Sequence, residues 1–365
     1  MFFEGVHKLR LANQIQQLNR NTLSIIISCM LVCAFCLPAC SSSDNRVAAS
    51  LLGEDITEQE VTDYIQTFRE TSEYTEESDW ESYLEEKGLT AEQFRTNTIY
   101  ELAAKVVIKH VAKENDIEID DDAVQERINN MRTSFLAEDD ETWKETLEKY
   151  NTDEKSLRER FEVQNLQQQV YNKLIDRVTP TDKDIKNYIK SNLLGSTTKK
   201  VFHIYASDYT TMQKMLREIQ KSSTVAEGIK SAKKQADGKK IIAEDLSWDF
   251  VGNLTQDMSE KIEDLGKGEI ADSLLSDSSA YHILYVEDVY TFPKKKVNVN
   301  QLPKSIKKAA SEAAEPDLWD TKCANWLRAQ IESSIEINYM PDGLPYATDT
   351  SSSSEESSTD ADSDK

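Results

Sequence analysis

Apolar side chains recur at three- and four-residue spacing between residues 57 and 193, which is the period of one face of an α-helix. The first such stripe comprises Val61, Tyr64, Ile65 and Phe68. It follows Thr57 and Glu60, whose spacing forms a capping box and so indicates the start of a helix. Similar starts recur at residues 78, 90 and 152. We therefore predict an almost wholly helical segment after a short strand and turn at residues 47–56.

From about residue 197 the period changes from 3.6 to 2. Alternation at residues 201–206 and 281–286 predicts two half-buried strands. The segments between them complete the order strand, helix, helix, strand, helix, strand. Residues 197–292 are therefore predicted to form a small α/β domain with an antiparallel sheet.

A helical pattern returns after this domain, but it is too short to bury a core of its own. We expect residues 293–346 to pack on the helical domain of residues 47–196, so that the small domain is an insertion. The predicted fold class is α+β. Residues 347–365 are acidic and rich in serine, which is typical of a disordered tail.

Residues 1–39 have the pattern of a signal peptide, in which basic residues precede an apolar run that is short for a membrane span. Leu37-Pro38-Ala39-Cys40 then resembles the lipobox of bacterial lipoproteins, whose cysteine is acylated, for example with palmitate. We expect a lipidated Cys40, a tether at residues 40–46 and a location on the outer face of the cell membrane. An uncleaved anchor helix is the alternative, and it leaves the topology unchanged.

The net charge is −23, from 43 Lys and Arg against 66 Asp and Glu. Such an excess of negative charge argues against a nucleic acid partner, whose phosphates would be repelled. The negative charge is better suited to protein clients that are cationic, or that are unfolded and basic. The alternative is that the acidity only keeps an exported protein in solution.

Motifs for cofactor and metal chemistry are missing from the expected folded body, because no Gly-rich phosphate loop, HExxH or GxSxG occurs in the sequence and no CxxC pair occurs after residue 40. We therefore expect no cofactor and no metal. Of the five cysteines, only Cys323 falls in the expected folded body, where a helical pattern predicts a small buried side chain.

Two histidines stand near the ends of the small domain, His203 in its first strand and His282 in its last. If these strands pair at the centre of one sheet, the two imidazoles come within reach of each other. The alternative is that each histidine is half-buried and bonded to a backbone partner of its own.

Four segments of the small domain resemble the parvulin family of peptidyl-prolyl isomerases in order and approximate spacing. They are Phe202-His-Ile-Tyr205, Asp245-Leu-Ser-Trp248, Leu265-Gly-Lys-Gly-Glu-Ile270 and Ala280-Tyr-His-Ile-Leu-Tyr-Val286. The flanking regions, near residue 52 and at residues 178–188, are similar to PrsA- and SurA-type extracytoplasmic foldases. The resemblance implies that His203, His282 and Asp237 are the active-site network. It also implies a proline pocket formed by Leu246, Leu254 and Met258.

The sequence departs from the parvulin pattern at the turn before the second strand, where Ala243-Glu244 replaces Gly-Gly and Ser247 replaces a further Gly. Met258 stands where the family has an aromatic side chain. The resemblance implies a membrane-anchored foldase that isomerises X-Pro bonds in unfolded or partly folded exported proteins. Two alternatives remain open: a chaperone that holds clients without catalysis, and a lipoprotein that only scaffolds an envelope assembly.

Overall fold

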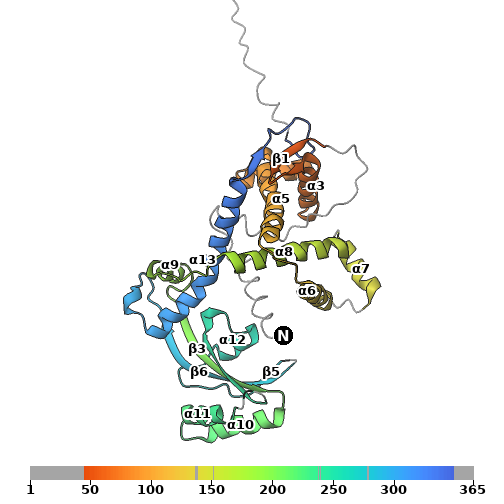
Figure 1. Ribbon diagram of the computed structural model, residues 1–365. Helices are drawn as coiled ribbons and strands as arrows, with labels where there is room; N and C mark the ends of the chain where they lie inside the picture. Colours follow the sequence, from red (N-terminus) through yellow and green to blue (C-terminus); the bar gives the residue numbers. More distant parts are fainter. Residues whose placement is uncertain are drawn as a thin grey trace, which may run out of the picture. The chain divides into compact units, whose positions relative to one another are not determined.

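The computed structural model describes residues 45–135, 139–150, 152–236, 238, 240–277 and 279–348 (Figure 1). By packing, the chain divides into two units. We call residues Arg177–Thr321 the sheet unit. Residues 45–176, together with residues 322–348, are called the helical unit.

The helical unit begins with a β-hairpin of β1 (Val47–Leu51) and β2 (Glu54–Thr57). Leu52 and Gly53 make its two-residue turn with φ values of 53° and 82°, which is the left-handed pair that a tight hairpin requires. On its other side β1 pairs antiparallel with β7 (Ile335–Ile337), so that the sheet order is β2-β1-β7. The strands thus join the beginning and the end of this unit.

Six helices follow the hairpin along the chain. They are α3 (Glu58–Thr71), α4 (Glu77–Lys87), α5 (Ala91–Glu114), α6 (Asp121–Ser134), α7 (Asp140–Lys149) and α8 (Glu154–Leu174). Helices α3 and α5 both begin with a capping box, at Thr57 and at Thr90. The last part of α13 (Lys304–Glu332) also belongs to this unit.

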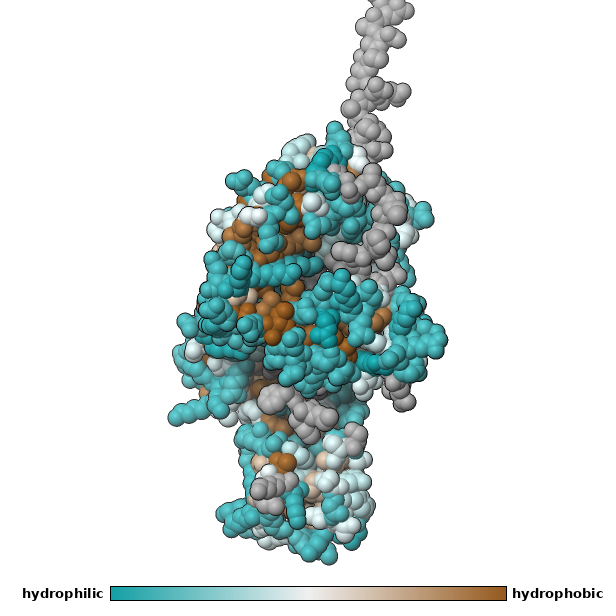
Figure 2. Space-filling model, turned by 45° about the vertical axis from the view of Figure 1, so that its right-hand side comes forward, coloured by the Kyte–Doolittle hydropathy of each residue, from teal (hydrophilic) through white to brown (hydrophobic). Residues whose placement is uncertain are grey.

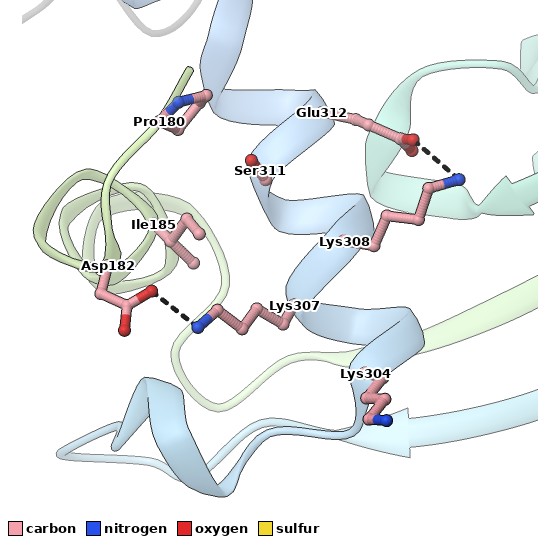
Figure 3. A pocket seen from close by; sticks show the side chains of 8 residues that line it. All are labelled: Pro180, Asp182, Ile185, Lys304, Lys307, Lys308, Ser311 and Glu312. Atoms are coloured by element: carbon pink, nitrogen blue, oxygen red, sulfur yellow. Dashed lines mark ion pairs between the residues drawn. The ribbon is translucent and has the colours of Figure 1, made fainter.

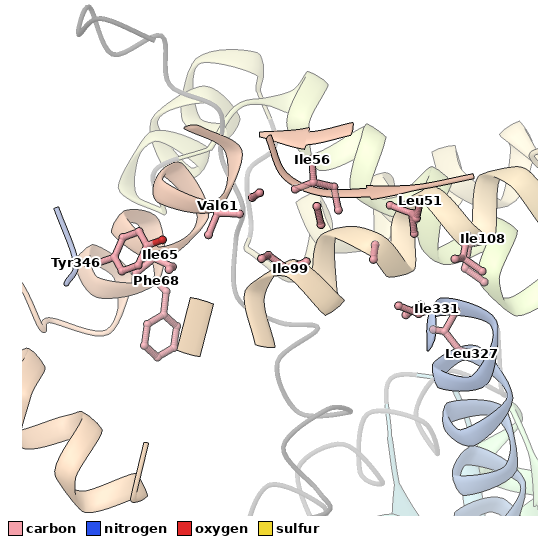
Figure 4. Close-up of a cluster of buried hydrophobic side chains, with 14 of the residues drawn as sticks. Leu51, Ile56, Val61, Ile65, Phe68, Ile99, Ile108, Leu327, Ile331 and Tyr346 are labelled. Atoms are coloured by element: carbon pink, nitrogen blue, oxygen red, sulfur yellow. The ribbon is translucent and has the colours of Figure 1, made fainter. Parts of the chain in front are cut away.

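The main core of the helical unit lies between β1, β2, α3, α5 and the end of α13 (Figure 4). Its labelled members are Leu51, Ile56, Val61, Ile65, Phe68, Ile99, Ile108, Leu327, Ile331 and Tyr346. A smaller cluster joins α6, α7 and α8 through Val124, Ile128, Trp143, Leu147, Leu157 and Phe161. Each element therefore buries the apolar stripe that the sequence period predicts.

A buried ion pair crosses the main core. Arg95 donates to both carboxylate oxygens of Glu58, from Nη2 to Oε1 at 2.5 Å and from Nε to Oε2 at 3.2 Å. It also donates to the carbonyl oxygen of Asn338 at 3.2 Å. Both charged residues are about 1% exposed. The pair therefore connects α3, α5 and the segment after β7 at a place that water does not reach.

The sheet unit contains one four-stranded antiparallel sheet in the order β4-β3-β6-β5. Its strands are β3 (Thr197–Ala206), β4 (Ile242–Trp248), β5 (Leu275–Ser276) and β6 (Tyr281–Thr291). Helices α10 (Tyr209–Lys221) and α11 (Val225–Gln235) pack on one face, and α12 (Gln256–Ile262) packs on the other (Figure 1). The first and last long strands, β3 and β6, lie at the centre of the sheet.

Two further helical segments complete the sheet unit. Helix α9 (Asp182–Asn192) and the first part of α13 share a cluster that includes Ile185, Ile189 and Ile306. The short 3-10 helices at Asp249–Val251 and Val299–Gln301 contribute Val251 and Val299 to the same cluster.

The α+β fold class predicted from the sequence is confirmed. The division of the chain differs in detail, because α9 and α13 up to Thr321 pack with the sheet. From the sequence, both segments are predicted to belong to the helical domain. Their apolar stripes are consistent with packing on either the helical unit or the sheet. The spacing of apolar residues shows which side chains are buried but not which element covers them. Cys323 is buried in α13, as expected.

The surface is largely hydrophilic in the view of Figure 2, with apolar residues gathered in smaller patches. In the described part of the chain, no helix has the length of apolar sequence that is needed to span a bilayer.

Candidate functional site

A row of four polar side chains crosses the sheet. Glu244 on β4 lies 3.2 Å from His203 on β3, measured between Oε2 and Nε2. His282 on β6 lies 3.1 Å from Asp277, measured between Nε2 and Oδ2. The two imidazole rings face each other between these pairs, with centroids 5.7 Å apart and planes inclined by 26°. We call these four residues the histidine row.

The register of the strands explains why both histidines lie on one face. His203 is opposite Leu284, and Tyr205 is opposite His282. Residues directly opposite each other on paired strands point to the same face, and alternate residues along one strand do so too. His203 and His282 are therefore diagonal neighbours. Tyr205 covers both rings, with centroids 4.8 Å from His203 and 5.5 Å from His282.

Both histidines are buried, at 2% and 1% exposure, whereas the carboxylates of Glu244 and Asp277 remain partly open to solvent. Burial lowers the pKa of His203 below its usual range. The hydrogen bond to Glu244 opposes this shift, and the neighbouring His282 adds to it. The neutral form of His203 is thus favoured near pH 7.

A turn before β6 holds Asp277 in place. Its Oδ1 accepts hydrogen bonds from the N–H and hydroxyl of Ser279 and from the N–H of Ala280, at 2.7 to 2.8 Å. Partial burial acts to raise the pKa of Asp277, but these hydrogen bonds and the nearby His282 outweigh it and lower the pKa to about 2. Asp277 is therefore ionised at any physiological pH and can only accept from His282.

The carboxylates define the tautomers of the histidines. An ionised carboxylate only accepts, so Nε2 must carry the proton in His203 and in His282. In a neutral ring the Nδ1 atom is then an acceptor, and both Nδ1 atoms are buried with no described donor. The row is thus a fixed polar layer rather than a proton-transfer pair, because no hydrogen bond joins one ring to the other among the described residues.

The three side chains expected to line a proline pocket lie together on the same face. Leu246, Leu254 and Met258 share an apolar cluster that also contains Val201, Ile262, Ala271, Leu284 and Val286. Each of the three is between 5% and 8% exposed. The three side chains therefore line a packed interior.

Sequence reasoning named only part of this site. His203 and His282 lie next to each other, whereas Asp237 and Cys40 fall outside the described residues. Glu244 and Asp277 were missed as histidine partners. Glu244 was visible in the sequence as an acidic residue at a Gly position of the resembled turn, and Asp277 as an acidic residue five positions before His282.

Two surface hollows lie elsewhere in the sheet unit, and neither is lined by His203 or His282. No group of three or more His, Cys, Asp or Glu side chains within the described residues is arranged to hold a metal ion.

One family model matches part of the chain. Residues 12–171 match the family model of the SurA-like N-terminal domain. No curated protein matches the chain.

Several solved structures are similar to the chain at low identity. One comes from work on PEB4 and Cj1289, two SurA-like chaperones of Campylobacter jejuni, with 13% identity, coverage of 81% of this chain and 99% of the other, and a TM-score of 0.36. Foldase protein PrsA of Lactococcus lactis has 14% identity, coverage of 80% and 95%, and a TM-score of 0.33. Foldase protein PrsA of Streptococcus pneumoniae has 12% identity, coverage of 78% of this chain and 93% of the other, and a TM-score of 0.29. Residues 12–171, somewhat less than half of the chain, are thus similar to the SurA-like N-terminal domain family.

Proposed function

We propose that this protein is a membrane-anchored extracytoplasmic foldase. In this proposal the helical unit holds unfolded exported chains, and the sheet unit isomerises their X-Pro bonds. The observation that carries the proposal is the histidine row, in which two buried imidazoles from the central strands meet on the sheet face that α12 covers. The SurA-like match of residues 12–171 supports the holding role.

The charge of the chain supports a cationic or unfolded client for the helical unit. Residues 177–321 carry 22 basic and 22 acidic side chains, so the whole net charge of −23 falls outside the sheet unit. Residues 70–86 alone contain eight acidic residues and no basic one. The half-buried rings of Tyr74 and Tyr83 lie in this acidic segment, with centroids 4.6 Å apart. Carboxylates and aromatic faces both attract Lys and Arg side chains.

Exposed apolar side chains are also concentrated in the helical unit. Of the eight large ones among the described residues, seven belong to it: Leu52, Ile119, Phe135, Tyr150, Leu174, Ile337 and Tyr339. An unfolded chain presents apolar segments that such positions can cover.

The sheet unit would act on the peptide bond before proline without a covalent step. Rotation about this bond is opposed by a barrier of about 20 kcal/mol and takes roughly 10–100 s without a catalyst. An apolar site formed by Leu246, Leu254 and Met258 would remove water from the imide and so disfavour its charge-separated planar form. His203 and His282, fixed by Glu244 and Asp277, would shape the polar wall of that site. Asp237 is proposed to join this network.

The anchor of the protein is proposed to be a lipid on Cys40. The basic residues, the apolar run and the lipobox-like Leu37-Pro38-Ala39-Cys40 support it. Residues 41–46 would then connect the lipid to β1.

Burial of the apolar cluster favours a second candidate function. Because Leu246, Leu254 and Met258 are each less than a tenth exposed, the sheet unit could have kept the fold and lost the catalysis. The protein would then only hold its clients.

A protease-coupled assay on a proline peptide tests the proposal, with the chain from residue 41 onwards, since every described hydrophobic cluster lies at or after Ala48. We expect acceleration over buffer and a loss of at least tenfold in kcat/KM for His203→Ala. The matched control is His110→Ala, because His110 lies on α5 and is 38% exposed. Its activity should stay unchanged.

Circular dichroism of each variant separates loss of function from loss of fold. A folded wild-type protein that gives no acceleration would remove the isomerase from the proposal. If the same protein suppresses the aggregation of an unfolded client, the second candidate function holds instead.

A further inference from the structure

The sheet unit carries a lysine-rich surface outside the histidine row. Between residues 289 and 311 the chain has six lysines and no acidic residue, although acidic residues outnumber basic ones by 66 to 43 in the whole chain. The six are Lys294, Lys295, Lys296, Lys304, Lys307 and Lys308. We call them the lysine surface.

Packing inside the sheet unit places four of these lysines around two hollows. Ile185 of α9 shares an apolar cluster with Val299 and Ile306, which lie on either side of the chain turn that leads into α13. A hollow of about 400 Å³ between α9 and α13 is lined by Lys304, Lys307 and Lys308, together with other residues (Figure 3). A second hollow of about 360 Å³ is lined by Lys296, with Tyr290, Pro293, Val297, Asn298, Gln301 and Leu302.

The positive charge of this surface is only partly balanced by the protein. Lys307 pairs with Asp182 at 2.7 Å, and Lys308 pairs with Glu312 at 3.2 Å (Figure 3). The remaining four lysines are exposed, and no ion pair joins any of them to a described residue. Three of the six fall within the first five residues of α13, where the helix dipole favours anions rather than cations. The arrangement is therefore one that an external anion would stabilise.

We propose that the lysine surface docks on the phosphate groups of an anionic phospholipid membrane. All six cations are lysines, which act as flexible point charges and do not require the fixed two-point geometry of an arginine–carboxylate pair. Such charges suit an array of mobile headgroups better than one shaped acidic peptide. Lysines near an anionic membrane each add to its attraction for the protein.

The overall negative charge of the protein does not oppose this docking strongly. At physiological salt, charges separated by more than about 8 Å of solution are largely screened, so the local lysines decide the contact. The inference is independent of isomerase activity. It agrees with the proposed lipid on Cys40, which would keep the protein beside a membrane.

Sedimentation with phospholipid vesicles tests the proposal. The protein from residue 41 onwards, which lacks Cys40, is mixed with vesicles of phosphatidylglycerol and phosphatidylcholine or of phosphatidylcholine alone. We expect binding to the anionic vesicles only, with a decrease as salt is raised. The triple variant Lys295→Gln, Lys296→Gln, Lys304→Gln should bind roughly a hundredfold more weakly, since each lysine near the membrane surface contributes roughly a factor of five and three such factors multiply.

The matched control removes three lysines of the same unit that are exposed and have no described ion pair, in the triple variant Lys221→Gln, Lys230→Gln, Lys234→Gln. It should bind as the wild type does. Equal losses in both triple variants, or no binding by the folded wild type, would overturn the proposal. So would binding of poly-glutamate, but not of vesicles, that depends on the lysine surface, because it would identify an acidic polypeptide as the partner. Prolyl-isomerase activity measured without vesicles should be equal in all three proteins, which separates this test from that of the proposed function.

Discussion

His203 lies between a carboxylate on one strand and a second imidazole on another, with the Tyr205 ring beside it at an inclination of 51°. Glu244 favours the protonated form of His203, whereas burial and the neighbouring His282 favour the neutral form. Burial is the largest of these effects, so the pKa of His203 in the folded state is below its usual value of 6.5.

A consequence for stability follows from this lowered pKa. As the pH falls below about 6.5, His203 becomes protonated in the unfolded chain while the folded protein resists protonation, so the free energy of unfolding decreases. The stability that the neutral His203 contributes is fully present above the pKa that His203 has in the unfolded chain. It is lost as the pH falls from that value through the pKa that His203 has in the folded protein. In His203→Gln, chemical denaturation at pH 7.5 and at pH 5.5 should show a smaller decrease than in the wild type. An equal decrease in both proteins would contradict the neutral, buried imidazole.

The substitution Glu58→Gln tests how much the buried ion pair contributes to the stability of the helical unit. Replacement by Gln leaves the charge of Arg95 buried without its counter-charge, which typically costs about 3–5 kcal/mol. Glu159→Gln is the control, because its pair with Lys155 spans 3.8 Å between side chains that are 64% and 85% exposed. We expect that control to change the free energy of unfolding by less than about 0.5 kcal/mol. Urea denaturation measures the free energy of unfolding of both variants. A change below about 0.5 kcal/mol in Glu58→Gln as well would show that the Glu58–Arg95 pair is dispensable for stability.

At the scale of helices and strands, the spacing of apolar residues along the chain predicted most of the fold. The strand and turn near residue 50, the capping boxes at Thr57 and Thr90, and the strands around His203 and His282 all occur as predicted. These elements could be predicted because helix caps, and the alternation of apolar and polar residues in a strand, depend on residues that are close together in the chain. The predicted cap at Ser78 is wrong, since α4 begins at Glu77 after Glu76 and has no side-chain cap. Trp80, near the start of the same helix, is fully buried.

The partners of the histidines could not be predicted in the same way. His203 meets Glu244 because β4 pairs with β3 in one register, and a shift by one residue would turn the carboxylate to the other face. Asp277 is aimed by hydrogen bonds to Ser279 and Ala280, which depend on the exact turn. Such contacts arise from pairing over long distances in the chain, which a period does not encode.

Helices α10 and α11 approach each other closely at Gly228. A Cβ atom added there would lie 2.7 Å from the backbone Cα of Ile219, which is much closer than real contacts allow. Gly228→Ala gains helix propensity of about 1 kcal/mol, but the overlap with backbone should outweigh it and give a net loss of about 1–3 kcal/mol.

The control for this change is Gly266→Ala, whose added Cβ would have the flexible Glu269 carboxylate as its nearest neighbour, at 3.5 Å. It should alter the free energy of unfolding by less than about 0.5 kcal/mol. Thermal unfolding of both variants makes the comparison. A tolerated alanine at residue 228 would contradict the tight packing of the two helices.

At the scale of the whole molecule, charge and surface chemistry are divided between the units. The sheet unit is neutral and contains the histidine row and the lysine surface, whereas the rest of the chain carries the acidic charge. This division matches a division of labour in the proposed foldase, with client holding in one unit and prolyl isomerisation in the other.

Refolding of a client whose slow phase is limited by prolyl isomerisation measures both proposed activities at once. At substoichiometric amounts, the wild-type protein should shorten the slow phase, whereas folded His203→Ala should leave its rate unchanged and still raise the yield of native client. A slow phase that the folded wild-type protein does not shorten would contradict the central claim that the histidine row serves an isomerase.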